Sequence, residues 1–431
     1  MFRLLSLATL LAGLPLALPV QAASIDTASY GYPITNAFES TITGTPPPLR
    51  PKVLADEDIN QADYRLDLDV VRDEKIPEIF WNVEKLSYRL AEQNGPAPLI
   101  FIIAGTGAPY SSGKPEFLKK LFYAAGYHVV QLSSPTSFDF ITAASTSATP
   151  GISKTDAEDL YRVMQAIKAK HSNLQVTRYN LTGYSLGALN AAFISHIDET
   201  QRSFNFERVL LLNPPVNLLT SVDNLDRLSR VDLNLRGKPP SFDPLFDKLA
   251  RYFKEKGRIE VDEALLFDFQ NSKERLTSPQ MASLIGAAFR FSVADIVYTS
   301  DLINKRGLIT PANMEVGYST ELVPYFKKAA TCNFRCYAEQ QLLPLWQQSN
   351  NHGSLAQLNQ QASLYALESY LKTSAKVAVM TNADDLILGP GDLTFLRRTF
   401  GERLTLYPLG GHCGNLDYRV NTDAMLEFFR G

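Results

Sequence analysis

A possible nucleophile lies between two glycines in the middle of the chain. The pattern is G-x-S-x-G, written here as Gly183-Tyr184-Ser185-Leu186-Gly187. An extended run at 176–182 precedes it and a helix-like run at 188–197 follows it. On a tight strand-to-helix turn the serine would point outward, and glycines are needed because side chains there would clash with neighbouring backbone. Ser185 is therefore a candidate nucleophile, and a small-residue turn that only packs a helix on a sheet is the alternative.

A serine hydroxyl needs a base within hydrogen-bond reach, and the base needs an acid that fixes its tautomer. His412 lies in a glycine-rich loop after an extended run at 403–408, so we expect it at the carboxyl end of a strand. Open α/β sheets bind ligands at that edge. The other four histidines are expected to be surface or hydrogen-bonded residues: His128, His171, His196 and His352.

Two adjacent carboxylates follow the preceding apolar run at 376–380. Asp385 is the preferred acid, because its spacing from Ile387 returns that isoleucine to the core. Asp384 is the alternative acid. Without a histidine further along the chain, a solvated turn would be the default interpretation of this pair.

The elements around these residues alternate between apolar extended runs and helical patterns. Extended runs are expected near 99–103, 128–135, 176–182 and 208–216, with helical patterns between them, and the alternation resumes at 376. This order predicts an α/β fold with a doubly wound, mostly parallel sheet. Residues 218–375 contain long helical stretches and no convincing strand, so they predict a large helical cap inserted before the acid-bearing strand.

The amino-terminal region has a different composition. Residues 1–22 carry one charge, an apolar run and a small-residue cleavage site, as a secretory signal peptide does. We therefore expect export to a periplasm or secretion. The expected organisation is a signal peptide at 1–22, an extended segment with little core at 23–60, an α/β core at 61–217 and 376–431, and a cap at 218–375. Within the core, 64–71 reads as an edge strand, and 81–90 as either a strand or a short helix.

Composition excludes some classes of protein. The 431 residues carry a net charge of −3, which argues against a nucleic-acid surface. No stretch after the signal peptide reads as a membrane span, so no stable membrane anchor is expected. Of the three cysteines, Cys332 and Cys336 are close enough to pair, which the sequence leaves open, and Cys413 is expected as a buried or free thiol. No histidine or second cysteine pair accompanies them, so no metal site is expected.

The chain order Ser185, Asp385, His412, each after a predicted strand, resembles that of the α/β-hydrolase family. The resemblance covers 97–216 and 376–431 but not the cap. It implies that Ser185 is the nucleophile, His412 the general base and then acid, and Asp385 the orienting carboxylate. It also implies an oxyanion hole made by the backbone N–H groups of Thr106 and Leu186.

Two features depart from the family pattern. The turn at 104–107 begins with Ala104-Gly105, where the family often has His-Gly. The strand at 178–182 is more polar than usual, which suggests a place nearer the sheet edge or under the amino-terminal segment; its glycosylation sequon at Asn180 is read as coincidence. Gly105-Thr106-Gly107 could instead suggest dinucleotide binding, but the third glycine and the following acid are missing. No cofactor is expected.

The resemblance implies acyl transfer through an acyl-enzyme, and the cap would decide the substrate. Apolar residues at 281–303, with Leu342, Leu343 and Trp346, could line an acyl pocket. We therefore expect a carboxylic ester hydrolase acting on a small-molecule or lipid-like ester with an apolar acyl part. A serine peptidase, amidase or acyltransferase is the alternative within the fold. A non-catalytic binding protein is the alternative from another class, and the intact serine, aspartate and histidine set argues against it.

Overall fold

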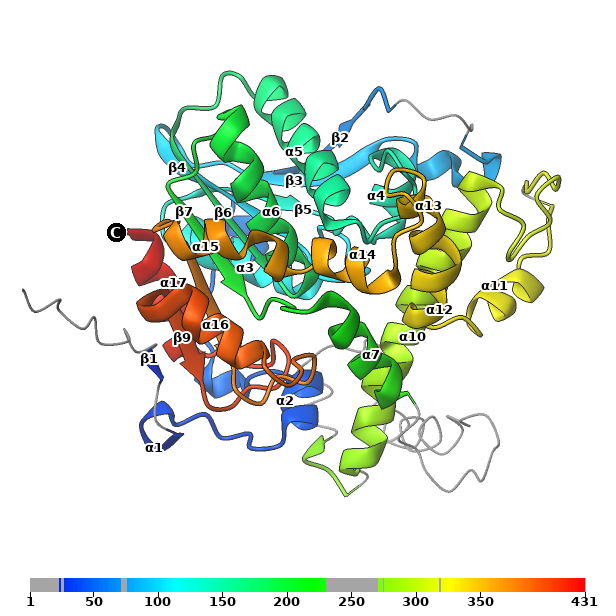
Figure 1. Ribbon diagram of the computed structural model, residues 1–431. Coiled ribbons are helices and arrows are strands. Elements are labelled where there is room, and N and C mark those ends of the chain that lie inside the picture. The colour runs from blue at the N-terminus through cyan, green and yellow to red at the C-terminus, as the bar shows by residue number, and fades with distance from the viewer. Residues whose placement is uncertain are drawn as a thin grey trace, which may run out of the picture.

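The computed structural model describes residues 23–24, 27–70, 76–229, 270–273, 275–317 and 319–430, so the expected signal peptide lies outside the described residues. Nine described strands form one sheet in the order β1-β9-β8-β7-β6-β4-β5-β3-β2 (Figure 1). Their bounds are β1 Ala23–Ser24, β2 Gln61–Leu66, β3 Leu86–Ala91, β4 Ala97–Ile103, β5 His128–Leu132, β6 Val176–Tyr184, β7 Arg208–Leu212, β8 Val377–Asn382 and β9 Leu404–Tyr407.

The sheet is parallel from β5 to β1, and β3 runs antiparallel to both β5 and β2. The strand ends lie in register: Ile103 pairs with Gly183, Tyr184 with Leu212, and Leu212 with Met380. Because parallel strands end at the same edge, the segments that follow β4, β6, β7, β8 and β9 meet there. The predicted doubly wound, mostly parallel α/β architecture is confirmed.

Helices cover both faces of the sheet (Figure 1). One face packs against α4 (Phe138–Ala143), α5 (Ser153–Lys170), α6 (Leu186–Gln201) and α16 (Asp392–Phe400). The other face packs against α3 (Gly113–Ala124) and α17 (Arg419–Arg430). Strands buried between two helical layers need apolar side chains on both faces, which explains the continuous apolar runs in the sequence.

The described residues between 218 and 375 form helices and no strand. They are α7 (Leu218–Leu228), α10 (Ser278–Asn304), α11 (Val323–Ala329), α12 (Phe334–Tyr337), a π-helical turn (Ala338–Leu342), α13 (Leu343–Gln347), α14 (Leu355–Ala362), a 3₁₀ turn (Leu364–Leu367) and α15 (Glu368–Thr373). Much of this segment shares an apolar cluster that is separate from the two clusters flanking the sheet. The same cluster also includes residues of the α/β part, such as Phe80, Ile141 and Ile387, and the assignment of 218–375 as a cap stays a prediction.

The longest of these helices, α10, corrects one expectation. A capping box at Thr277 and Gln280 starts it, and Lys305 in the left-handed region ends it. By length and composition it could cross a membrane, contrary to the expectation that no later stretch would. However, most of its apolar window is buried inside the protein, as in the core helix of a soluble domain. Length and hydropathy alone are therefore weak evidence for a membrane span here.

The segment at 23–60 differs from the expected extended lead-in. It contains α1 (Thr27–Tyr30), α2 (Ala37–Thr43) and two 3₁₀ turns (Pro47–Leu49 and Asp56–Asp58). Its aromatic side chains pack into the core beside α17. Tyr30 is 1% exposed and stacks on Tyr407, with ring centroids 5.1 Å apart. Its hydroxyl donates a 2.7 Å hydrogen bond to Asn421. The expectation of little core was wrong, because these aromatic residues pack against elements that are remote in sequence.

Three smaller expectations can also be compared with the structure. An edge strand is present as expected, but β2 spans Gln61–Leu66 and not 64–71. The undecided segment 81–90 splits into a 3₁₀ turn (Glu78–Val83) and β3. The suggestion that the polar strand before Ser185 lies near the edge was wrong, because β6 lies between β4 and β7; its polar residues at 176–179 are its exposed end, and Asn180 is fully buried.

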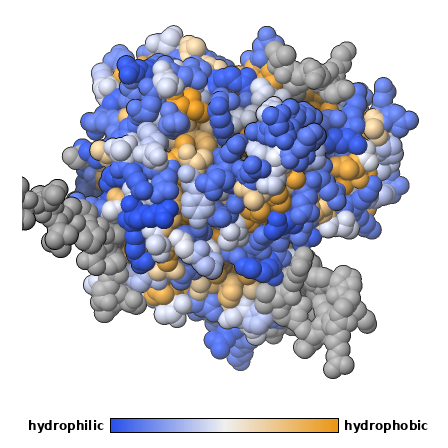
Figure 2. Space-filling view, in the orientation of Figure 1, coloured by the Kyte–Doolittle hydropathy of each residue, from blue (hydrophilic) through white to orange (hydrophobic). Residues whose placement is uncertain are grey.

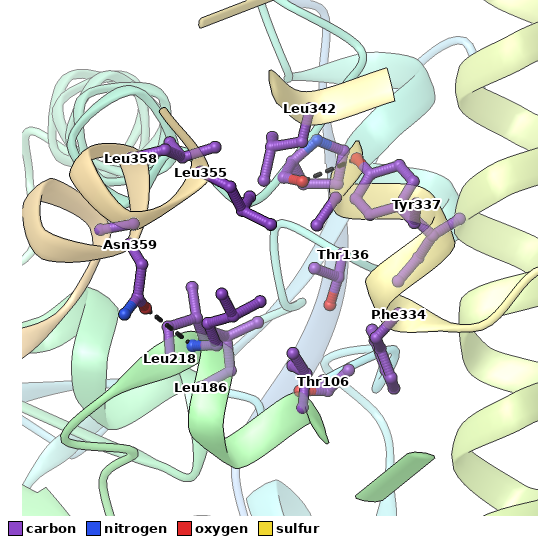
Figure 3. A pocket seen from close by; sticks show the side chains of 17 residues that line it. Thr106, Thr136, Leu186, Leu218, Phe334, Tyr337, Leu342, Leu355, Leu358 and Asn359 are labelled. Atoms are coloured by element: carbon purple, nitrogen blue, oxygen red, sulfur yellow. Dashed lines mark hydrogen bonds between the residues drawn. The ribbon is translucent and has the colours of Figure 1, made fainter. Parts of the chain in front are cut away.

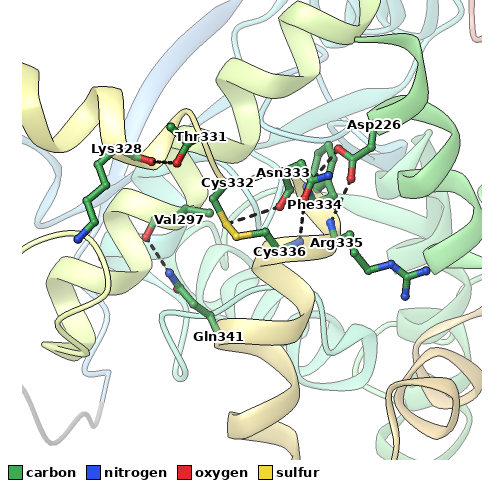
Figure 4. Close-up of a disulfide and its surroundings, with 10 residues drawn as sticks. All are labelled: Asp226, Val297, Lys328, Thr331, Cys332, Asn333, Phe334, Arg335, Cys336 and Gln341. Carbon is green, nitrogen blue, oxygen red and sulfur yellow. Dashed lines mark hydrogen bonds between the residues drawn. A yellow bond between two sulfur atoms is a disulfide. The ribbon is translucent and has the colours of Figure 1, made fainter. Parts of the chain in front are cut away.

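Cys332 and Cys336 form a disulfide, with their Cα atoms 5.3 Å apart (Figure 4). The segment between them, where α12 begins, is also anchored to α7. Asp226 accepts hydrogen bonds from the Phe334 and Arg335 N–H groups, at 3.2 and 3.1 Å. Cys413 is buried and free, as expected. The disulfide and the carboxylate together fix the start of α12, which carries Phe334.

Candidate active site

The turn after β6 has a backbone conformation that side chains rarely adopt. Ser185 has φ 54° and ψ −127°, and its N–H donates a 2.9 Å bond to the Leu212 carbonyl. A Cβ at Gly183 would lie 2.3 Å from the Gly187 oxygen, and one at Gly187 would lie 2.2 Å from the Ile103 oxygen. Only glycine fits at either position, so the turn holds the serine outward on a strained backbone.

The structure brings together the three side chains that the sequence singled out. Ser185 Oγ lies 2.8 Å from His412 Nε2. His412 Nδ1 lies 3.0 and 3.1 Å from the two carboxylate oxygens of Asp385. All three residues are buried, with 8%, 7% and 6% of their surface exposed. A serine bonded to one ring nitrogen and a carboxylate bonded to the other is the arrangement that allows the histidine to act as a general base.

The two neighbouring aspartates contact different groups. Asp385 accepts hydrogen bonds from the Asn213 side-chain amide at 2.8 Å and from the Ile387 N–H at 3.1 Å. Asp384 instead accepts from the Gly410 and Gly411 N–H groups, at 3.2 and 2.9 Å. Asp385 therefore faces the imidazole, while Asp384 holds the backbone of the loop that carries it.

Sequence reasoning missed Asn213. It follows β7 at the same sheet edge, has φ 48°, and its N–H donates to the Met380 carbonyl at 2.8 Å. Its amide donates to Oδ2 of Asp385 while the Ile387 N–H donates to Oδ1, and the two bonds together hold the carboxylate plane. A polar residue directly after a buried apolar strand was the signal that could have identified it.

The electrostatics of His412 follow from its two neighbours. Burial disfavours the charged imidazolium, but the negative charge of Asp385 and the Cys413 sulfur, 4.0 Å from Nε2, outweigh it. The pKa of His412 is therefore raised well above its ordinary value of 6.5. An imidazole with a raised pKa takes a proton from the serine more readily, which favours proton transfer in that direction.

The turn after β4 lies against Ser185. A Cβ at Gly105 would lie 3.2 Å from Ser185 Cβ, and the Gly107 N–H donates to the Thr136 hydroxyl at 2.8 Å, which fixes the turn. Among the described residues, the N–H groups of Thr106 and Leu186 donate to no other protein group. Two free N–H groups beside a nucleophile could stabilise an oxyanion.

An apolar pocket of about 80 Å³ opens beside this turn (Figure 3). Thr106 and Leu186, the latter next to Ser185 in sequence, line it, and α7, α12 and α14 supply most of the rest. Apolar side chains that line it are Leu218, Val222, Ile296, Phe334, Leu342, Leu355 and Leu358. In the space-filling view, apolar surface is visible in the region between α7 and α14 (Figure 2).

Only part of the expected pocket lining lies there. Ile296 of α10 and Leu342 do line the pocket. Trp346 instead borders a second, larger groove of about 710 Å³, and Leu343 packs into the cap cluster. The contributions of α7 and α14 were missed, because their apolar periodicity is equally compatible with a buried core face.

The other four histidines lie outside this constellation. The His128 ring accepts from the Gln93 N–H at 3.0 Å, and His171 bonds to the Tyr88 hydroxyl at 2.7 Å. The His196 ring packs on Tyr370, and His352 is exposed. Each has the surface or hydrogen-bonded role that was expected from its place in the sequence.

No protein-family model matches the chain, and no curated protein matches its sequence. Solved structures that it resembles include Est1E from Butyrivibrio proteoclasticus (12% identity, 86% of this chain and 99% of that one, TM-score 0.38). Another is the thioesterase domain from the curacin biosynthetic pathway (12% identity, 86% of this chain and 99% of that one, TM-score 0.39). A third is proline iminopeptidase from Mycobacterium smegmatis (12% identity, 86% of this chain and 98% of that one, TM-score 0.40).

These similarities are low, so the fold is identified from the chain itself. The evidence is the parallel sheet with β6 between β4 and β7, the strained turn after β6, and the order of serine, aspartate and histidine along the chain. With these features, the chain has the α/β-hydrolase fold.

Proposed function

We propose that this protein is a serine hydrolase that cleaves a carboxylic ester with an apolar acyl group. The observation that carries the proposal is the continuous hydrogen-bonded chain from Ser185 Oγ through His412 to Asp385. A purely structural cluster would not require a serine held at φ 54° with its hydroxyl on the imidazole.

In the proposed reaction, Ser185 Oγ attacks the ester carbonyl while His412 Nε2 accepts the hydroxyl proton. The negative charge on the carbonyl oxygen is stabilised by the N–H groups of Thr106 and Leu186. The ester C–O bond then breaks, and His412 returns the proton to the departing alcohol. Water attacks the acyl-enzyme in the same way, with His412 as base, and releases the acid and free Ser185. Asp385 holds the ring in the tautomer that both steps need.

The pocket supports an apolar acyl group. Thr106 and Leu186 lie at one end of it, so a carbonyl bound by their N–H groups would direct its acyl chain into the pocket. The lining is almost entirely aliphatic or aromatic, and no charged side chain lines it. Such a surface gains free energy from covering methylene groups, about 0.8 kcal/mol for each, and offers nothing to a charged amino terminus.

The test is a substrate screen of the purified chain with the Ser185→Ala variant as control. p-Nitrophenyl esters from acetyl to palmitoyl would be compared with aminoacyl p-nitroanilides. We expect esters to be turned over and the rate to rise with acyl length until the pocket is filled. Faster turnover of the anilides would replace the ester proposal by a peptidase or amidase. Transfer of the acyl group to an added alcohol, in preference to water, would indicate an acyltransferase.

We also propose that the protein is exported, without a stable membrane anchor after signal cleavage. The charge, apolar run and small residues of 1–22 motivate this, and β1 begins directly after that segment, at Ala23. Amino-terminal sequencing of the protein from a cell fractionation should give a mature chain that begins at Ala23 in the exported fraction. An intact Met1 on protein in the cytoplasmic fraction would contradict export.

A further inference from the structure

The loop that carries His412 is bonded to a helix 371 residues earlier in the chain. Thr41, on α2, accepts a 2.9 Å hydrogen bond from the His412 N–H. The same hydroxyl donates to the Ala37 carbonyl at 2.7 Å. The hydroxyl thus links the backbone of the histidine to the first turn of α2.

Close backbone contacts reinforce this link. A Cβ at Gly411 would lie 2.2 Å from the Ala37 oxygen, and a Cβ at Gly414 would lie 2.1 Å from the Ser40 oxygen. Ser40 Oγ donates to the Gly410 carbonyl at 2.8 Å. The glycines on either side of His412 therefore allow α2 to touch the loop directly, and no side chain lies between them to absorb a shift.

An adjacent face of α2 contacts the helical segment 218–375. Phe38 and Ile42 pack against the apolar cluster of the cap, and the Asn36 side-chain amide donates to Ser278 Oγ, at the start of α10, at 2.7 Å. Residues 38 and 42 share one face of the helix, while 37, 40 and 41 share another. One short helix is thus fixed on one face to the cap and on the other to the histidine loop.

We infer that Thr41 is a positioning residue for His412, and that α2 sets the place of the imidazole between Ser185 and Asp385. The inference rests on the proposed function, because the position of the ring matters only if the ring transfers a proton. A misplacement of about 1 Å in a reacting group can reduce a rate by about a hundredfold.

The test compares Thr41→Val, Thr41→Ser and Thr43→Val in ester turnover. Valine keeps the size of threonine but cannot accept from the His412 N–H, whereas serine can. Thr43 is the matched control, because its hydroxyl donates to the Glu39 carbonyl of the same helix at 2.9 Å and, among the described residues, makes no hydrogen bond to the histidine loop. Melting temperatures would show that all three variants are folded.

We expect Thr41→Val to lower kcat by about tenfold to a hundredfold with KM changed by less than about twofold. Thr41→Ser should restore most of the rate, and Thr43→Val should keep it. The inference is overturned if Thr41→Val retains the wild-type kcat, if serine does not restore it, or if Thr43→Val loses as much.

A second measurement does not depend on turnover. The proton on His412 Nδ1, shared with Asp385, should give a low-field NMR signal in the wild type and in Thr43→Val, and this signal should shift or disappear in Thr41→Val. An unchanged signal in Thr41→Val would overturn the inference. If no ester is turned over faster than by Ser185→Ala, the proposed function fails, and this signal still decides whether Thr41 positions the ring.

Discussion

At the scale of single residues, Asp384 and Asp385 differ in their hydrogen-bond partners, and these partners determine their different roles. Both are acidic, adjacent and at the same sheet edge, so composition and position alone do not distinguish them. Asp385 bonds to His412 Nδ1 and Asn213, whereas Asp384 bonds to two backbone N–H groups. Substitutions at the two positions should therefore affect different properties.

Asp385→Asn should reduce kcat by about 10⁴-fold, because an amide stabilises the wrong histidine tautomer. Asp384→Asn should reduce kcat much less and should instead lower the free energy of unfolding by about 1–3 kcal/mol, since an amide nitrogen would face the Gly410 or Gly411 N–H. Steady-state kinetics and denaturant unfolding of both variants measure the two effects. The opposite pattern would make Asp384 the catalytic acid.

The pH dependence of ester turnover should report the environment of His412. The imidazole acts as a base only when it is neutral, so kcat/KM should rise as the pH rises through the pKa of His412. Because Asp385 raises that pKa well above 6.5, the acid limb of the profile should lie above the range of an ordinary histidine. In Asp385→Asn the limb should move to lower pH. A wild-type limb at or below 6.5 would contradict the proposed electrostatics.

At the scale of elements, α14 separates two cavities. Leu358 and Ala362 line both the apolar pocket beside Thr106 and the groove of about 710 Å³. Leu358 is 2% exposed, so its side chain fills the wall between them. The maximum length of the acyl chain should therefore depend on this one side chain.

Leu358→Ala should move the preference of the enzyme toward longer acyl chains, because it opens the pocket into the groove. It should also cost about 2–5 kcal/mol of stability, as truncation of a buried leucine does. Leu367→Ala is the matched control, since Leu367 is similarly buried and lines only the groove. Relative kcat/KM values over the p-nitrophenyl ester series measure the change. The same length preference in wild type and Leu358→Ala would place the acyl chain elsewhere.

Some secondary-structure elements could be predicted from the sequence and others could not. The buried strands β4, β5, β7 and β8 are short apolar runs, and local patterning is sufficient to recognise them. The strand-to-helix turn at 183–187 was recognisable because two glycines and a serine indicate a local steric requirement. The position of β6 in the middle of the sheet could not be recognised from the sequence, because its exposed polar end at 176–179 resembles an edge strand.

At the scale of the whole molecule, the features that were missed are contacts between distant parts of the chain. Tyr30 packs on Tyr407, Thr41 bonds to His412, and Asn213 bonds to Asp385. None of these pairs leaves a periodic or local signal, because each residue is compatible with a loop when it is read alone. The contacts of these residues become visible only in the folded protein, where segments that follow several strands meet at one edge of the sheet.

The most direct test of the catalytic role of Ser185 is covalent labelling. The wild-type protein would be treated with a fluorophosphonate, digested and mapped by mass spectrometry, with Ser185→Ala treated in parallel. We expect one adduct on Ser185 in the wild type and none in the variant, because only a serine activated by His412 beside an oxyanion hole reacts at neutral pH. Equal labelling of the two proteins, or an adduct on another residue alone, would contradict the proposal that this is a serine hydrolase acting through Ser185.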